Sequence, residues 1–169
     1  MAIRRSYILL AVVLSLLLTL LVGCGGSGCH ENRSSIPQAV LYASNYPDKK
    51  IAIDSISVYG VGQSQGSLLL DCARGVSSFK LPFRNDADTT QFVIRYEMKA
   101  LASSQYNDTL TFIYRRHPYF ISGDCGVVFN YYIDALHYTH NVLDSAVVVA
   151  KEVNNVEQET VRIYYYVAN

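Results

Sequence analysis

Residues 91–99 read QFVIRYEMK, and this stretch decides the fold class. Apolar side chains stand at every even-numbered position, whereas polar or charged side chains hold most of the odd-numbered ones. The even-numbered set consists of Phe92, Ile94, Tyr96 and Met98. An apolar period of two is typical of a β-strand that buries one face and exposes the other. The stretch therefore predicts a half-buried strand.

The same alternation recurs on the C-terminal side, in residues 109–115, 127–133 and 160–167, and residues 146–149 form a short apolar run. Turn-forming residues separate the strands, at positions 60–66, 84–88, 103–108, 122–126 and 154–159. Short strands at such spacing indicate an antiparallel β-sandwich of about seven to nine strands, immunoglobulin-like or jelly-roll-like.

Two features on the N-terminal side are less regular. Ile51 and Ile53 share one parity, and Ile56 and Val58 share the other, which predicts a strand with a bulge near Asp54. Residues 38–44 are the only stretch that tolerates a helix, and this stretch is short.

The N-terminus reads as a secretory signal. Arg4 and Arg5 precede an apolar run from residue 8 to residue 22, and these 15 residues are fewer than the roughly 20 that span a membrane as a helix. The junction LVGC at residues 21–24 resembles the lipobox of bacterial lipoproteins. We therefore predict a signal peptide over 1–23, lipidation of Cys24, a flexible tether over 24–35 and one domain over 36–169.

The predicted lipid and the net charge restrict where the protein is located and what it binds. Acyl chains on Cys24 attach a protein to a membrane, because each buried methylene contributes about 0.8 kcal/mol. In lipoproteins of the Bacteroidota, a short acidic run after the lipidated cysteine resembles a signal for export to the cell surface. No such run follows Cys24, which favours the periplasmic face of the outer membrane. Two of the 14 basic residues lie in the signal peptide, so 12 remain against 14 acidic residues, and we expect no nucleic-acid partner.

The remaining cysteines are Cys29, Cys72 and Cys125. In an oxidising compartment we expect a disulfide between Cys29 and Cys125, which would pin the tether to the domain. Cys72 follows the apolar run 68–70, so we expect it to be a buried free thiol. Three free thiols remain the alternative, because spacing does not determine connectivity.

One motif invites a catalytic interpretation. Residues Gly62–Gly66 match GxSxG, the nucleophile elbow that presents a serine, here Ser64, between a strand and a helix. The following residues 67–72 are strand-like, so a hairpin loop explains the motif better. We expect no enzymatic activity.

Candidate metal ligands are incomplete. His137 and His140 would share a face only on a helix, and Asn85, Asp86 and Asp88 lack the glycine and glutamate of a calcium loop. We expect no metal and no cofactor.

The chain has 14 tyrosines and no tryptophan. Neighbouring tyrosines in strands place rings on both faces, so Tyr132, Tyr164 and Tyr166 are candidates for a binding surface. Packing of a thin sandwich explains the same residues and is the favoured interpretation.

A second pattern, an aspartate followed by a hydroxyl residue, occurs four times and resembles the acceptor consensus of periplasmic O-glycosylation in Bacteroidota. The candidate acceptors are Ser55, Thr89, Thr109 and Ser145. The alternative is that Asp, Ser and Thr favour the turns that lead into strands.

Four short motifs carry a resemblance to a family. They are DTLTF at 108–112, YFIS at 119–122, DCG at 124–126 and IYYY at 163–166. With these the chain resembles a family of small uncharacterised Bacteroidota cell-envelope lipoproteins, known as a domain of unknown function. The resemblance implies an envelope location and a β-sandwich, and it supplies no catalytic residues.

These observations favour a non-enzymatic binding or scaffold lipoprotein. It would contact an envelope protein through strand edges or through the tyrosine-bearing face. The alternative is a glycan-binding or glycan-processing accessory lipoprotein, which requires an aromatic cleft and, for hydrolysis, two facing carboxylates.

Overall fold

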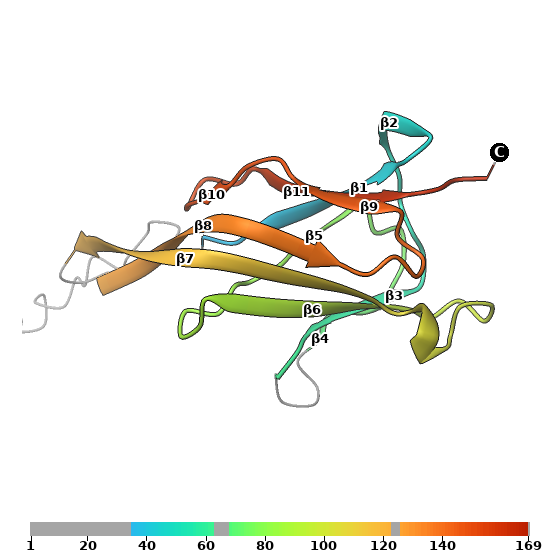
Figure 1. Ribbon diagram of the computed structural model, residues 1–169, viewed down its shortest axis with the longest axis horizontal. Helices are drawn as coiled ribbons and strands as arrows, with labels where there is room; N and C mark the ends of the chain where they lie inside the picture. Colours follow the sequence, from blue (N-terminus) through green and yellow to red (C-terminus); the bar gives the residue numbers. More distant parts are fainter. Residues whose placement is uncertain (1–34, 63–67, 123–125, 169) are drawn as a thin grey trace, which may run out of the picture. The chain divides into compact units, whose positions relative to one another are not determined.

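The computed structural model describes residues 35–62, 68–122 and 126–168, and these residues form two β-sheets (Figure 1). Strands account for nearly all of the regular structure, which confirms the predicted all-β sandwich. The described residues form eleven strands, more than the expected seven to nine, because several are very short. No helix in this part of the chain is long and apolar enough to cross a membrane.

The first sheet has five strands. Its order is β2 (Tyr46–Lys50), β1 (Gln38–Ala43), β11 (Glu159–Tyr165) and β9 (Ser145–Val148), and β5 (Ser78–Lys80) lies along β1 on the same side as β2. β1 and β11 run parallel, with Ala39 opposite Val161 and Ala43 opposite Tyr165. The other strand pairs of the described residues are antiparallel.

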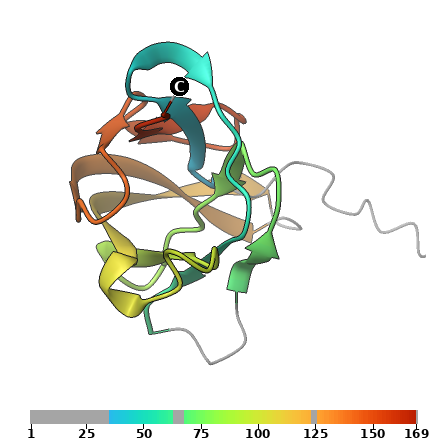
Figure 2. The ribbon, with the colours of Figure 1, turned by 90° about the vertical axis from the view of Figure 1, so that its right-hand side faces the viewer.

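The second sheet has six strands. Its order is β10 (Glu152–Val153), β8 (Gly126–Tyr138), β7 (Asp108–Ser122), β6 (Thr89–Tyr96), β3 (Ile56–Gly60) and β4 (Leu68–Ala73). A short 3-10 turn, η1 (Ser104–Tyr106), lies between β6 and β7. Seen from the end that carries the β1–β2 hairpin, β1 and β11 lie above β7 and β8 (Figure 2).

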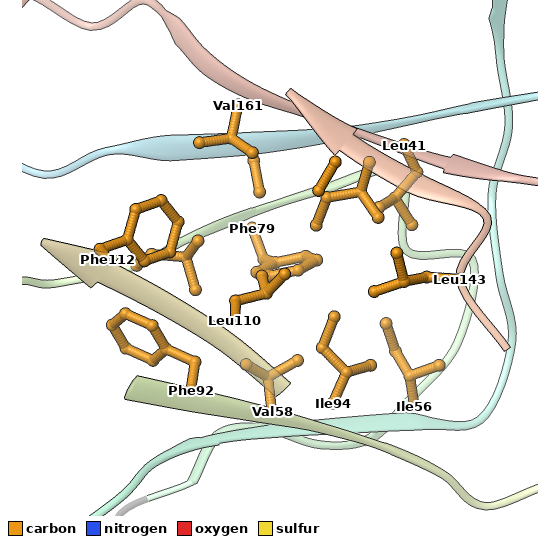
Figure 3. Close-up of a cluster of buried hydrophobic side chains, with 14 of the residues drawn as sticks. Leu41, Ile56, Val58, Phe79, Phe92, Ile94, Leu110, Phe112, Leu143 and Val161 are labelled. Carbon is orange, nitrogen blue, oxygen red and sulfur yellow. The ribbon is translucent and has the colours of Figure 1, made fainter. Parts of the chain in front are cut away.

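The core lies between the two sheets (Figure 3). Leu41 and Val161 of the first sheet and Ile94 and Leu110 of the second are fully buried. The predicted inward face of β6 is therefore confirmed up to Tyr96. Met98 is an exception with 46% of its side chain exposed, because β6 ends at Tyr96.

Of residues 38–44, which the sequence allowed to be helical, residues 38–43 form strand β1 instead, and residue 44 lies in the following turn. Every residue from Ala39 to Ala43 is buried. β1 has β11 on one side and both β2 and β5 on the other. This central place in the sheet overrides a weak local preference for helix.

The bulged strand expected near Asp54 is also wrong. Ile53 forms only an isolated bridge to Val76, and β3 begins at Ile56. Between them Ser55 adopts a φ of +58°, and the Asp54 carboxylate accepts a hydrogen bond of 2.6 Å from the N–H of Gly75. The change of parity therefore marks a turn that carries the chain into the second sheet.

Asp108 at the start of β7 is fully buried, and five donors surround its carboxylate. They are the hydroxyls of Tyr96 and Thr139 and the N–H groups of Asn141, Val142 and Leu143, at 2.8–2.9 Å. A buried charge is tolerable when it is hydrogen-bonded in this way. Asp108 thus fixes the connection between β8 and β9.

Candidate interaction surfaces

The β7–β8 hairpin extends beyond the strands on either side of it. β7 and β8 pair from Leu110 opposite Tyr138 as far as Ser122 opposite Gly126. β6 accompanies β7 only to Ile113, and β10 accompanies β8 only at two residues. We call residues 117–122 and 126–130 the overhang, since no third strand pairs with them in the described part of the chain. Figure 1 shows this end of β7 and β8 projecting beyond the other strands.

The overhang carries exposed apolar side chains on both of its faces. Tyr119 is 56% exposed, Phe120 65% and Val127 56%. Phe120 lies opposite Val127 in the register, so these two side chains share a face. Tyr119 precedes Phe120 in the same strand and therefore points to the other face.

An aromatic cluster holds the root of the hairpin. The ring of Phe83 stacks on Tyr114 with 4.3 Å between centroids, and Tyr131 meets both rings edge-on. The Tyr114 hydroxyl donates to the carbonyl of Arg84 at 2.8 Å and lies 2.6 Å from Oγ1 of Thr90. Burial raises the pKa of both tyrosines, so they are neutral in the folded protein. The overhang therefore projects from a packed base.

The acidic residues near this end of the overhang form ion pairs with arginine side chains. Arg116 donates from Nε to Asp88 at 2.8 Å and from Nη1 to the carbonyl of Asn85 at 2.7 Å. Arg84 binds both carboxylate oxygens of Asp86, at 3.0 and 2.9 Å, and this hydrogen bonding lowers the pKa of Asp86. Within the described ranges, no group of three or more His, Cys, Asp or Glu is placed to hold a metal ion.

The described chain begins at the overhang. The hydroxyl of Ser35 donates to Oδ1 of Asn130 at 2.9 Å, and Asn130 lies opposite His117 in the register. The segment that leads back to Cys24 thus joins the domain at this end. Cys24, Cys29 and Cys125, the predicted lipidation site and disulfide, lie outside the described residues.

Each sheet also has a terminal strand with exposed aliphatic side chains. β4 ends the second sheet and exposes Leu68 and Leu69, and β9 ends the first sheet and exposes Val147. Cys72 lies in β4 as a free thiol, but it is exposed. Its expected burial is wrong, because an edge strand is covered less than the apolar run before it suggests.

The three candidate tyrosines do not form one surface. Tyr132 lies in β8 of the second sheet, where the Arg115 guanidinium stands 4.8 Å over its ring. Tyr164 lies in β11 of the first sheet, with its ring 5.8 Å from that of Tyr42, and Tyr166 follows β11 in an exposed position. Aromatic rings in separate sheets do not line a common cleft.

The GxSxG motif begins at Gly62, whose φ of +83° suits glycine. Ser64 lies outside the described residues. The strands before and after the motif, β3 and β4, pair antiparallel, so the motif connects two strands and not a strand and a helix.

The candidate acceptor residues differ in accessibility. Thr89 at the start of β6 is exposed, whereas Ser55, Thr109 and Ser145 are half-buried. The aspartate before Thr109 is the buried Asp108.

The overhang was not predicted from the sequence to be an exposed apolar surface. Its signal was present: Tyr119, Phe120 and Ile121 are three consecutive apolar residues directly before a turn, where the alternation stops. A strand covered on one face does not need such a run.

The fold and its surfaces define a class, a two-sheet β-sandwich with an overhanging two-stranded ribbon and open sheet edges. The chain belongs to the family of unknown function DUF6452, whose family model matches residues 55–165. The matched region runs from the residue before β3 to the end of β11 and leaves out β1 and β2. Searches of curated proteins and of solved structures found no match.

Proposed function

We propose that this protein is a lipid-anchored, non-enzymatic binding or scaffold module of the bacterial cell envelope, related to lipoproteins of Bacteroidota. Lipidated Cys24 would attach it to the outer membrane on the periplasmic side. The domain would bind an extended segment of another envelope protein.

The observation that carries the binding role is the pair of open sheet edges. Within the described residues β4 and β9 each have a partner strand on one side only, and both expose aliphatic side chains. An unpaired edge offers N–H and C=O groups to an incoming strand, and neighbouring apolar side chains add contact area. Val147 on β9 is the most exposed of the aliphatic side chains within these two strands.

The anchor rests on the sequence LVGC at residues 21–24. Two or three acyl chains bury enough methylenes, at about 0.8 kcal/mol each, to hold a protein on a membrane for long times. A disulfide between Cys29 and Cys125 would shorten the free tether to about five residues, or at most roughly 18 Å.

The anchor is tested by replacing Cys24. We expect the wild-type protein to fractionate with membranes and to carry the mass of the lipid, whereas Cys24→Ser loses both properties. Wild-type protein in the soluble fraction without added lipid would contradict the proposal.

The binding role is tested with a photo-crosslinking amino acid in intact cells. Placed at Val147 or Leu69, the probe should give a discrete protein adduct. Placed at Lys99, an exposed residue in the connection between β6 and β7, it should not. Equal labelling at all three positions, or recovery of glycans alone, would contradict a protein partner at the edges, and the second result would support the glycan-binding alternative.

A further inference from the structure

The overhang is an unusual place for large apolar side chains. From His117 onward in β7 and up to Asn130 in β8, the two strands have only each other as strand partners in the described part of the chain. A two-stranded ribbon alone in water is marginally stable, and exposed aromatic residues at its end add no stability there. We therefore expect Tyr119 and Phe120 to be covered by something other than water.

Whatever covers the end of the overhang has to contact both of its faces. Phe120 and Val127 lie on one face and Tyr119 on the other, and more than half of each side chain is exposed. A flat protein surface, or a second copy of this chain packed face to face, would cover one face and leave the other in water. A medium that the end of the ribbon enters edge-on covers both.

The path of the chain indicates which medium lies nearby. Ser35 is bonded to Asn130, and from the Asn130–His117 pair to Phe120 is three residues of β7, or about 10 Å. Cys24 precedes Ser35 by 11 residues, which reach at most about 40 Å when extended. A lipid on Cys24 therefore lies within reach of the overhang.

We propose that the end of the overhang, with Tyr119, Phe120 and Val127, lies in the headgroup region of the membrane to which Cys24 is attached. The inference rests on the proposed lipid anchor and adds an orientation to it. The lipid and the overhang would then hold the domain at two points, with the β1–β2 hairpin directed away from the bilayer.

The chemistry of the overhang fits the headgroup region better than the hydrocarbon core. Tyrosine rings favour the interface, where the ring is in an apolar setting and the hydroxyl is hydrated. Backbone groups on the outer edges of β7 and β8 have no strand partner among the described residues here, and such groups need water or polar headgroups. Pro118 has no N–H, which removes one of these donors from the edge.

The test uses the fact that the chain contains no tryptophan. In the full-length lipidated protein, Phe120→Trp places the single tryptophan in the overhang, where it is excited selectively over the tyrosines. Tyr46→Trp is the matched control, since Tyr46 is an exposed aromatic residue in β2, at the opposite end of β1 from Ser35. Figure 1 shows β2 and the end of the β7–β8 hairpin at opposite ends of the domain.

Each variant is reconstituted in phosphatidylethanolamine and phosphatidylglycerol vesicles, with or without bromine on the acyl-chain carbons nearest the headgroups. We expect bromine to lower the fluorescence of Phe120→Trp by a factor of about two or more, because the indole lies at the interface. The fluorescence of Tyr46→Trp should not change. Val127→Trp, on the same face, replaces Phe120→Trp if the latter does not fold.

The other outcomes separate the two proposals. Protein that floats with the vesicles but shows no quenching in the overhang would overturn the orientation and leave the anchor intact. Equal quenching at both positions would also overturn it. The orientation would also be overturned if the fluorescence of Phe120→Trp changed with the amount of protein per vesicle and not with bromine. This last result would favour self-association. Protein that carries no lipid and does not float would overturn the anchor itself.

Discussion

The hydroxyl of Tyr96 donates a 2.8 Å hydrogen bond to Oδ2 of Asp108 and lies 3.0 Å from the hydroxyl of Tyr165. Because the single proton of Tyr96 is used on Asp108, Tyr165 is the donor in the second bond. Tyr96 and Asp108 belong to the second sheet and Tyr165 to the first. A polar chain thus crosses the interior and joins the two sheets.

Asp108→Asn should lower the free energy of unfolding by about 3 kcal/mol or more. Asparagine offers one acceptor oxygen in place of two, and its amide would face N–H groups that also need an acceptor. Asp144→Asn, at an exposed aspartate in the same region, should change stability by less than about 0.5 kcal/mol. Denaturant unfolding measures both, and similar values for the two variants would refute a structural role for Asp108.

Tyr96→Phe should cost about 1 to 2 kcal/mol of unfolding free energy. The variant keeps the ring in the core, but it removes one donor from Asp108 and the acceptor of the Tyr165 hydroxyl. Tyr166→Phe is the control, since Tyr166 is 73% exposed and should tolerate the change. Unaltered stability of Tyr96→Phe would mean that the polar chain does not help to join the sheets.

Alkaline pH should destabilise the domain through its buried tyrosines. Burial raises the pKa of five of them above the usual 10.0, namely Tyr42, Tyr96, Tyr114, Tyr131 and Tyr165. Between pH 10 and the higher pKa of each tyrosine in the folded protein, the unfolded chain releases the proton while the folded protein keeps it. Stability therefore falls as pH rises over that interval, by at most about 1.4 kcal/mol per pH unit for each tyrosine.

Unfolding free energies measured on both sides of pH 10 check this slope. Tyr165→Phe should make the decline with pH shallower by the contribution of one tyrosine, whatever its effect at neutral pH. The absorbance of tyrosinate should rise in two stages, the second together with unfolding. A single reversible rise without loss of structure would contradict the prediction.

The strands that could be predicted from the sequence are those with the core on one face and water on the other. β6 alternates because one face meets the core and the other meets water, and Phe92, Ile94 and Tyr96 are buried accordingly. Met98 continues the pattern in the sequence but not in the structure. After Tyr96 the N–H of Glu97 bonds to the carbonyl of Ser55, a contact with a distant residue that no local pattern encodes.

Features set by sheet order were not predictable in the same way. β1 is buried from Ala39 to Ala43 without alternation, and its parallel partner β11 lies about 120 residues further along the chain. Cys72 follows three leucines yet is exposed, because β4 occupies an edge. The candidate surfaces depend on where neighbouring strands stop, and strand ends are determined by such distant pairings.

Among the four candidate O-glycosylation sites, Thr89 should carry the modification in protein from the native source. Thr89 is exposed, whereas Thr109 is half-buried beside the buried Asp108. Intact-mass measurement should show added hexose that Thr89→Ala removes and Thr109→Ala retains. A native mass that equals the lipidated polypeptide would refute the modification.

The disulfide between Cys29 and Cys125 should appear in non-reducing peptide maps. Cys125 belongs to the three-residue connection between Ser122 and Gly126, and Gly126 lies four residues, or about 13 Å, along β8 from Asn130. Cys29 precedes Ser35 by six residues, which reach about 20 Å, so the tether is long enough to return to the end of the hairpin.

Cys72 is a poor alternative partner for Cys125. It lies in β4, four strands from β8, or about 19 Å across the sheet, whereas disulfide-bonded cysteines have Cα atoms less than about 7 Å apart. Cys72→Ser should therefore leave the Cys29–Cys125 peptide and the stability unchanged. Cys29→Ser should lower the unfolding free energy by up to about 4 kcal/mol, since the bridge closes a loop of roughly 100 residues. A map that joins Cys72 to Cys125 would require the hairpin end and the β4 edge to come together, against the sheet order. A map that joins Cys72 to Cys29 would refute the predicted pairing as well.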